Sequence, residues 1–451
     1  MKKYLLVSLF LFAFLNKALP QKKLNEVVVF PHSTTMVANG EDSIAIDFWI
    51  ADTTESIVVS PNVVVNILLQ GDGKIIGSTN DTSITCKIIE QRCRIFVKSS
   101  THVGKIKLFA RAEGFYEGNT DITTISPSVV NIITPITDYF LTKRQSKKQD
   151  PGLMLGADIS FLPELEAKGI KFTDKGVQKD PIVILKDHGF NYVRLRIFNE
   201  PANADGYSPS KGFCDLSHTL QMAKRVKAAG MKLLLDFHYS DYWADPGKQY
   251  KPQAWKALSF VEMKKALYDF TYNVMDSLRL QNTLPNMVQV GNEINHGMVW
   301  PEGDIQHPDS LAQLIRAGTA AVKQVAPNTV MLIHVALGGQ NTESVFFIDQ
   351  MLKRKVHFDV IGLSYYPRWH GTVDDLKDNI KDLIKRYKKY VCVVEYSAKK
   401  QPVNNVIFEE KKYGRGSFIW EPLNTWEKVF DWKGNSNDFI MEYDIIRKKF
   451  L

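Results

Sequence analysis

The strongest constraint on the fold is a series of eight apolar runs between residues 152 and 422, separated by stretches with helical periodicity. The runs are GLMLGADIS, YVRLRIF, KLLLDFHYS, MVQVGNEIN, VMLIHVA, FDVIGLSYYP, VCVVEYS and GSFIWEP. Between them lie stretches such as LSHTLQMAKRVKAAG and FVEMKKALYDFTYNVMDSL, in which apolar residues recur three and four positions apart. Near-continuous apolar strands that alternate with helices are typical of a parallel sheet covered by helices. Eight such units predict a (β/α)8 TIM barrel over residues 152–451.

The chain before residue 135 follows a different pattern. Short runs with alternating apolar residues (NEVVVF, DSIAIDFWI, NVVVNILL, SITCKII, CRIFVKS, KIKLFARAEG and TDITTI) are separated by turn sequences such as NGED and GDGK. Roughly seven short strands in this length predict an immunoglobulin-like β-sandwich over residues 22–138, serving as a spacer or binding glycan. The polar, basic segment TKRQSKKQDPG predicts an exposed linker over 139–151. The predicted fold class is therefore α/β, a barrel preceded by an all-β sandwich.

The N-terminus has the pattern of a targeting segment. MKK provides positive charge, and YLLVSLFLFAFL is an apolar stretch too short to span a bilayer comfortably. This combination predicts a signal peptide over residues 1–20. No second long apolar run follows, so we expect an exported protein without a transmembrane segment, located in the periplasm, outside the cell or at the cell surface.

Charge and cysteine content exclude two classes of partner. The formal net charge is +8, but the basic residues are scattered, and runs such as KDNIKDLIKRYKKY have the pattern of a solvated helix face. Without a concentrated basic patch, nucleic-acid binding is not expected. Cys86 and Cys93 could form a disulfide in an oxidising compartment, whereas Cys214 and Cys392 are expected to be buried thiols. No His or Cys spacing indicates zinc.

In a barrel of this kind the chemistry belongs at the carboxyl ends of the strands. The residues read from those ends are Asp158, Arg196, His238, Asn292 with Glu293, His334, Tyr365 with Tyr366, Glu395, and Trp420 with Glu421. Almost every run thus ends in a polar or aromatic residue, which predicts a single functional mouth. Of the two tyrosines, we expect Tyr366 to face the mouth and Tyr365 to pack. Glu421 is expected to hydrogen-bond, and His334 could lie inside the barrel.

Two glutamates indicate the reaction. Glu293, in VGNEINHG, ends the fourth run and Glu395 ends the seventh, so their carboxylates can converge across the opening. Glycoside hydrolysis needs one protonated acid for the leaving oxygen and one carboxylate for the anomeric carbon or a water molecule. A gap of about 5–5.5 Å would retain configuration, and one of roughly 6.5–9.5 Å would invert it. We expect Glu293 to be the acid, then the base, and Glu395 to be the nucleophile.

The neighbouring residues have expected roles around this pair. Asn292 can bond the 2-hydroxyl of the sugar, a contact that strengthens in the transition state. Arg196 is expected to keep Glu395 ionised, and Tyr366 to donate a hydrogen bond to it. His238 and Trp420 would line the subsite, since an indole offers a flat apolar face to a pyranose ring.

The barrel region resembles the glycoside hydrolases of family 53, endo-β-1,4-galactanases of clan A. The resemblance rests on GADISFLPELEAKG, NYVRLRIF, AKRVKAAGMKLLLDFHYSDYWADPGKQ, VGNEINHGMVWPEG, GLSYYPRW, VVEYS and FIWEP, which occur in that order. It implies retention and a groove for β-1,4-linked galactose. It also implies a set of substrate-binding residues, namely Asp158, Arg196, His238, Asn292, Tyr366 and Trp420 at the centre and Trp243 and Trp369 as stacking platforms further along. Alternatives are a related clan A enzyme for another β-linked glycan, or a non-catalytic galactan-binding protein.

The chain also departs from the family pattern. IFNEPAN follows the second run, where relatives carry Trp and a different loop, and the segment between Glu395 and GSFIWEP is short. Relatives that bind a structural calcium do so around this region, but here the only acids are Glu409 and Glu410. We therefore expect no metal and no cofactor, and a monomer whose partner is the polysaccharide.

Overall fold

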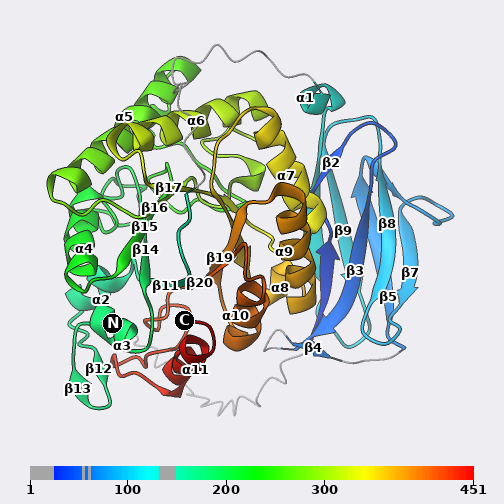
Figure 1. The fold of residues 1–451 in the computed structure, drawn as a ribbon. Helices are drawn as coiled ribbons and strands as arrows, with labels where there is room; N and C mark the ends of the chain where they lie inside the picture. Colours follow the sequence, from blue (N-terminus) through cyan, green and yellow to red (C-terminus); the bar gives the residue numbers. More distant parts are fainter. Residues whose placement is uncertain (1–24, 53–55, 59–61, 132–148) are drawn as a thin grey trace, which may run out of the picture.

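A computed structural model describes residues 25–52, 56–58, 62–131 and 149–451. The predicted signal peptide (1–20) and residues 139–148 of the predicted linker (139–151) lie outside these residues. The described chain forms an N-terminal β-sheet region (residues 25–125) and a barrel (residues 154–451), which lie side by side (Figure 1).

The β-sheet region consists of two five-stranded sheets. The first sheet contains β1 (Glu26–Pro31), β3 (Ser43–Ala51), β8 (Cys93–Ser99) and β6 (Gly73–Ile75) in that order, with β4 (Ile57–Val58) beside β3. The second contains β2 (Thr35–Val37), β10 (Gly118–Ile125), β9 (Lys105–Arg111), β5 (Val64–Gly71) and β7 (Ser83–Lys87). All seven predicted runs form strands. The pairs are antiparallel except β2 with β10.

The two sheets pack face to face around one apolar core that takes side chains from both. β5 shows why: Val65, Ile67 and Leu69 alternate with exposed residues, so one face of the strand is buried and the other is wet. The predicted all-β sandwich is thus present, and its assignment to the immunoglobulin type stays a prediction. Cys86 on β7 and Cys93 on β8 belong to opposite sheets, and both thiols are free.

Eight parallel strands close into a barrel, which confirms the predicted (β/α)8 architecture. In order they are β11 (Met154–Asp158), β14 (Tyr192–Ile197), β15 (Lys232–Phe237), β16 (Met287–Val290), β17 (Val330–Val335), β18 (Val360–Tyr365), β19 (Tyr390–Tyr396) and β20 (Gly414–Ile419). Nearly every residue of these strands is buried, as expected when helices cover a parallel sheet. A small hairpin, β12 (Thr173–Asp174) and β13 (Val177–Gln178), precedes the second barrel strand.

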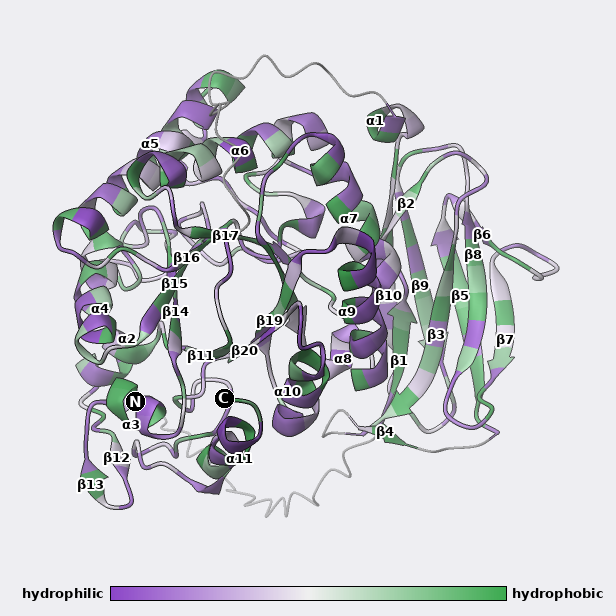
Figure 2. Ribbon diagram, viewed as in Figure 1, coloured by the Kyte–Doolittle hydropathy of each residue, from purple (hydrophilic) through white to green (hydrophobic). Residues whose placement is uncertain are grey.

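Helices surround the barrel, with hydrophobic and hydrophilic residues alternating along them (Figure 2). They are α2 (Leu162–Ala167), α3 (Pro181–Asp187), α4 (Leu216–Ala228), α5 (Phe260–Leu280), α6 (Pro308–Val325), α7 (Asn341–Lys353), α8 (Pro367–His370), α9 (Val373–Tyr387), α10 (Lys400–Glu409) and α11 (Met441–Phe450). A short helix, α1 (Pro127–Asn131), follows the β-sheet region. Capping boxes begin two of the long helices, Ser259 with Glu262 at α5 and Thr372 with Asp375 at α9.

Strands β1 and β3 of the first sheet are buried on both faces. The outer face of this sheet carries a second apolar cluster that includes Phe30 and Trp49, which are 1% and 2% exposed. β1 lies against α8 of the barrel, and Gly371, just after α8, brings its backbone against the Phe30 ring. An added Cβ at Gly371 would lie 2.7 Å from the Phe30 Cζ atom, so the close approach depends on glycine.

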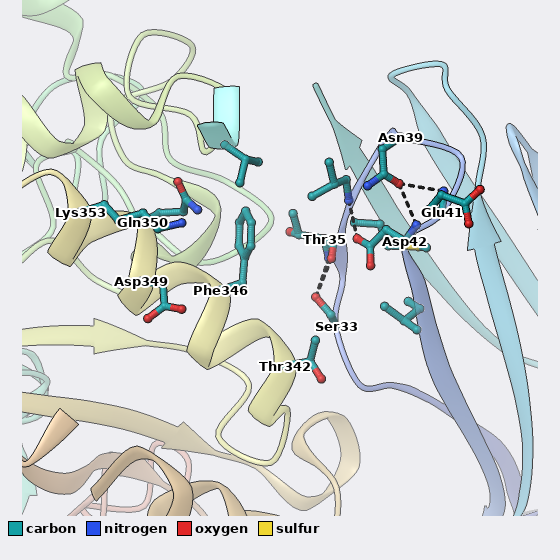
Figure 3. Close-up of a pocket in the computed structure, with 14 residues that line it drawn as sticks. Ser33, Thr35, Asn39, Glu41, Asp42, Thr342, Phe346, Asp349, Gln350 and Lys353 are labelled. Atoms are coloured by element: carbon teal, nitrogen blue, oxygen red, sulfur yellow. Dashed lines mark hydrogen bonds between the residues drawn. The ribbon is translucent and has the colours of Figure 1, made fainter. Parts of the chain in front are cut away.

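Polar contacts complete this junction. Arg92 donates hydrogen bonds to Asp375 (2.8 Å) and Thr372 (3.0 Å) at the start of α9, and Arg368 pairs with Glu26 (2.8 Å). A pocket of about 530 Å³ lies between the β-sheet region and α7, where residues such as Ser33 and Thr35 face Thr342 and Phe346 (Figure 3). None of the helices in the described part of the chain is both long and apolar enough to cross a membrane.

Candidate active site

The two predicted glutamates lie at the carboxyl ends of their barrel strands. Glu293 follows β16 and Glu395 is the penultimate residue of β19, and they are only 8% and 5% exposed. The Glu293 backbone is left-handed (φ 50°, ψ 52°), a conformation that non-glycine residues rarely adopt and that tends to occur at functional sites. Because the charge of Glu395 acts on Glu293, the two carboxyl groups share one electrostatic environment.

Arg194, rather than Arg196, is the cation that pairs with Glu395. Its Nη1 donates to Glu395 Oε2 at 2.7 Å, and its Nη2 donates to Asp236 Oδ2 at 2.9 Å and to Asn292 Oδ1 at 2.8 Å. Burial alone would lower the pKa of Arg194, but the carboxylates of Asp236, Glu395 and Asp158 raise it overall. The prediction that Arg196 keeps Glu395 ionised is therefore wrong. Both arginines face the barrel interior from alternate positions of β14, and Arg194, which lies deeper in the barrel, is the one that reaches Glu395.

Arg196 instead organises one wall of the mouth. It donates a hydrogen bond to Glu421, the residue after Trp420 beyond β20, which confirms that Glu421 is held by hydrogen bonding. Its guanidinium lies 4.2 Å from the Trp243 ring centroid and 4.4 Å from that of Phe161. Burial, opposed by the Arg196 charge, raises the pKa of Glu421 well above its usual range.

Glu293 is held in a way that favours its protonated form. Burial first, and then the charge of Glu395, raise the pKa of Glu293 well above its usual range. Its backbone N–H donates to Nδ1 of His334 at 3.2 Å, and Nε2 of His334 lies 2.8 Å from the Ser364 hydroxyl. Burial and the charge of Arg194 lower the pKa of His334, so this ring is neutral and donates from Nε2. Hydrogen bonding with Ser364 lowers the pKa of Glu293, but it is a smaller effect than the two that raise it.

Glu395 is held in a way that favours its charged form relative to Glu293. Burial raises the pKa of Glu395, but the charge of Arg194 and the Tyr366 hydrogen bond oppose this rise. The Tyr366 hydroxyl donates to Glu395 Oε1 at 2.5 Å, which confirms the contact expected for Tyr366. Tyr365, by contrast, is 1% exposed and bonds the Gly371 carbonyl, as expected of a packing residue.

Three further predicted residues line the same interior. Asp158 accepts two hydrogen bonds from Ser160 and lies 3.4 Å from Arg194. His238 Nε2 lies 3.1 Å from Asp236 Oδ2, while its Nδ1 accepts the Ala244 N–H. Asn292 donates to the carbonyl of Ala244 at 2.9 Å, which uses one of its two N–H groups.

The tryptophans lie at two depths. Trp243 and Trp420 are edge to face at 5.8 Å, so Trp243 belongs with the central residues and not further along the groove as predicted. Trp369 is 49% exposed and packs edge-on against Tyr366 at 6.0 Å, on the rim. Trp426, which was not predicted from the sequence, is 51% exposed and also packs edge-on against Tyr366 at 6.0 Å.

Several residues of the site were not predicted. They are Arg194, Asp236, Gln289, Ser364 and Trp426. A usable signal existed for two of them, because polar side chains two positions apart within buried strands point to the same face. Arg194 precedes Arg196 by two positions, and Asp236 precedes His238, within or just after barrel strands. No comparable signal marks Ser364, Trp426 or Gln289, whose side chain donates to Asp236 at 2.6 Å.

The described residues contain no group of three or more His, Cys, Asp or Glu side chains suited to hold a metal ion. Glu409 is the last residue of α10 and Glu410 follows it. The segment between Glu395 and β20, where relatives bind calcium, therefore contributes only this one acidic pair. The expectation of no metal and no cofactor stays a prediction.

The model of glycosyl hydrolase family 53 matches residues 154–406, which is more than half of the chain and begins at the first barrel strand. The chain belongs to glycosyl hydrolase family 53. An arabinogalactan endo-β-1,4-galactanase of Cellvibrio japonicus (strain Ueda107) is 40% identical over 249 residues, covering 53% of this chain and 64% of that protein. An endo-β-1,4-galactanase of Bacillus subtilis (strain 168) is 36% identical over 261 residues, covering 58% and 59%.

The solved family 53 catalytic domain of Ignisphaera aggregans is 32% identical with a TM-score of 0.62, and the similarity covers 70% of this chain and 99% of that one. The chain therefore spans less than two thirds of the two curated family 53 relatives but nearly all of a solved family 53 domain. The match to the family model lies entirely within the barrel, so the β-sheet region is outside it.

Proposed function

We propose that this protein is a retaining endo-β-1,4-galactanase with Glu293 as acid/base and Glu395 as nucleophile. The proposal rests on the different surroundings of two buried carboxyl groups at one mouth, one of which favours the protonated form and the other the charged form. The pKa of Glu293 is raised well above its usual range by burial and by the charge of Glu395. Arg194 and Tyr366 stabilise the charge of Glu395. Such separation of two pKa values supports Glu293 as the acid and Glu395 as the nucleophile.

The proposed reaction proceeds in two displacements. The Glu395 carboxylate attacks the anomeric carbon while Glu293 gives its proton to the leaving oxygen. In the resulting glycosyl-enzyme Glu395 is a neutral ester, so the repulsion that raised the Glu293 pKa is gone. Glu293 is then a carboxylate able to take a proton from water as that water attacks the same carbon. The bond to Glu395 breaks, which releases the Glu395 carboxylate and restores Glu293 as the acid. The remaining N–H of Asn292 is available to the sugar 2-hydroxyl.

The substrate proposal rests on the relatives. The Cellvibrio japonicus and Bacillus subtilis proteins carry the names of β-1,4-galactanases, and we propose β-1,4-galactan of the pectic arabinogalactan type for this chain. The central subsites would be formed by Asp158, Arg196, His238, Trp243, Asn292, Tyr366 and Trp420. Trp369 would lie on the rim. The alternatives are a different β-linked glycan and non-catalytic galactan binding.

Digestion of unbranched β-1,4-galactan, with products resolved over time, tests the proposal. Random internal cleavage is expected, and NMR of the first products should show the β-anomer before mutarotation. Mannan and arabinose-decorated galactan in parallel distinguish the other glycans. If Glu293→Gln and Glu395→Gln variants matched the wild type, the catalytic assignment would be rejected in favour of binding.

We also propose that the protein is exported by the segment 1–20 and acts as a monomer. Residues 22–138 would form the immunoglobulin-like domain and 139–151 its linker. N-terminal sequencing of the exported protein, with light scattering for its mass, tests these proposals. An intact Met1 in the mature protein would reject export by cleavage.

A further inference from the structure

A buried carboxylate on α7 connects the β-sheet region to the segment that follows Glu293. Glu343 is 1% exposed. Its Oε2 accepts the backbone N–H of Thr34 at 2.6 Å and the Thr34 hydroxyl at 2.5 Å. Its Oε1 accepts Nδ2 of Asn295 at 2.5 Å and lies 3.0 Å from Nε2 of His296. Thr34 belongs to the segment between β1 and β2, so half of the carboxylate's donors come from outside the barrel.

The Glu343 carboxylate is ionised and fully occupied. Burial raises the pKa of Glu343, but the His296 charge and the hydrogen bonds from His296 and Thr34 lower it to about 2. Oε2 accepts two hydrogen bonds from Thr34, and Oε1 accepts one from Asn295 and pairs with the His296 ring. Nε2 of that ring also lies 2.7 Å from the Thr34 hydroxyl, so Thr34 contacts His296 directly. A buried charge that loses a partner bears the full desolvation penalty of the group, so the loss of one donor is expected to shift the others.

The same two barrel residues are held from their far sides. Oδ1 of Asn295 accepts the Ala336 N–H at 3.1 Å, and Nδ1 of His296 lies 2.9 Å from the carbonyl oxygen of Pro246. A ring nitrogen facing a carbonyl must donate, and the other nitrogen faces a carboxylate. Burial lowers the pKa of His296, but the Glu343 charge raises it overall, consistent with an imidazolium.

Asn295 and His296 follow Glu293 in one short turn, Ile294–His296. We infer that Thr34 and Glu343 are positioning residues for Glu293, so that the β-sheet region helps to aim the acid at the glycosidic oxygen. The inference rests on the proposed function. A general acid must lie within hydrogen-bond reach of its oxygen, and a displacement of about 1 Å can cost on the order of a hundredfold in rate. The β-sheet region is thus more than a spacer.

Leaving-group dependence tests the inference. Galactan needs a proton on its leaving oxygen, whereas 2,4-dinitrophenyl β-1,4-galactobioside needs almost none, and kcat/KM reports the first displacement for both. We expect Thr34→Val to lower kcat/KM on galactan about fivefold and Glu343→Gln at least about tenfold, with the dinitrophenyl substrate changed less than twofold. Thr34→Ser keeps the hydroxyl and should behave as the wild type.

Arg92→Gln is the matched control, because it removes contacts across the same junction without touching the turn after Glu293. It should lower stability and leave the ratio of the two kcat/KM values unchanged. Equal losses on both substrates in Thr34→Val and Glu343→Gln, or no loss, would overturn the inference. Glu293→Gln separates the two proposals: if it shows no leaving-group effect, the proposed function itself fails.

Discussion

Two buried charge clusters border Glu293, and they are built in opposite ways. In the mouth a single guanidinium, that of Arg194, is shared by the carboxylates of Asp236, Glu395 and Asp158. At the junction a single carboxylate, that of Glu343, is surrounded by donors.

The difference separates chemistry from scaffolding. The mouth has more acids than cations, so one carboxyl group is pushed towards its protonated form, and a mobile proton is what acid catalysis requires. The Glu343 carboxylate at the junction is paired with donors and carries no proton at neutral pH, because its pKa is about 2. Substitutions in the mouth should therefore change the rate most. Substitutions at the junction should change stability, and should change the rate less, through the position of Glu293.

The largest effect is expected for Glu395→Gln. Removing the nucleophile should reduce kcat/KM on galactan by on the order of 10⁴-fold or more. Initial rates of reducing-end release measure this. Glu409→Gln, an exposed acid at the end of α10, is the control and should retain full activity. A Glu395→Gln enzyme with a tenth of wild-type activity would contradict the assignment.

Replacing each arginine of β14 by lysine, one at a time, tests the comparison within the mouth. Arg194→Lys cannot reproduce the forked contacts to Glu395, Asp236 and Asn292, so we expect a loss of about 100-fold to 1,000-fold in kcat. Arg196→Lys should lose about tenfold, since Arg196 acts through Glu421 and the aromatic wall. Kinetics of both variants on one substrate decide, and a larger loss at Arg196 would reverse our assignment.

The pH profile should be bell-shaped with identifiable limbs. Activity requires Glu293 protonated, so it falls as pH rises through the raised pKa of Glu293. It requires Glu395 ionised, so it also falls as pH drops through the pKa of Glu395. Glu395→Gln removes the neighbouring charge and should lower the Glu293 pKa, which ¹³C-labelled glutamate NMR can follow. An unchanged Glu293 titration would mean that the two groups do not interact.

Breaking the junction cluster should cost stability. The folded-state pKa of Glu343 is depressed from 4.5 to about 2, so its contribution is present above pH 4.5 and is lost as pH falls towards 2. The shift corresponds to roughly 3 kcal/mol at neutral pH. Glu343→Gln should lower the denaturation midpoint at pH 7 and flatten its dependence on acid pH. A variant as acid-sensitive as the wild type would contradict this.

The smallest effect concerns the apolar part of the junction. Gly371→Ala forces a Cβ to within 2.7 Å of Phe30 at a φ of +80°. Gly169→Ala is the matched control, because Gly169 has a φ of +81° and no atom within 4 Å of the same position. Both substitutions incur the backbone penalty of about 1–2 kcal/mol, and only Gly371→Ala adds a clash. The thermal denaturation midpoint of Gly371→Ala should therefore be lower than that of Gly169→Ala. Equal midpoints would show that the contact with Phe30 does not contribute to stability.

Much of this arrangement could be predicted because it depends on periodicity. The eight apolar runs, and the glutamates at the ends of the fourth and seventh, follow from strand order alone. The sequence does not show whether Arg194 or Arg196 reaches Glu395, because alternate residues of a strand share a face. Only the tilt of the strand in the barrel decides between the two. Thr34 was beyond reach, since nothing in its sequence neighbourhood indicates a partner on α7 more than 300 residues away.

One signal in the β-sheet region was present but unused. DSIAIDFWI alternates as far as Asp47 and then becomes continuously apolar through Trp49 and Ile50. A strand of a two-sheet sandwich needs only one apolar face, so the change indicates that the outer face is covered as well. The pattern could not say what covers it, and the structure supplies the barrel.

The buried outer face of the first sheet has a practical consequence for modularity. A barrel expressed from residue 152 onward would leave the surface around Gly371 bare, and an isolated sandwich would present Phe30 and Trp49 to water. Neither region can be removed, or fused to another enzyme, without redesigning the surface that the junction leaves exposed. Gene fusions that exchange such accessory domains would here have to transfer the β-sheet region and the barrel together.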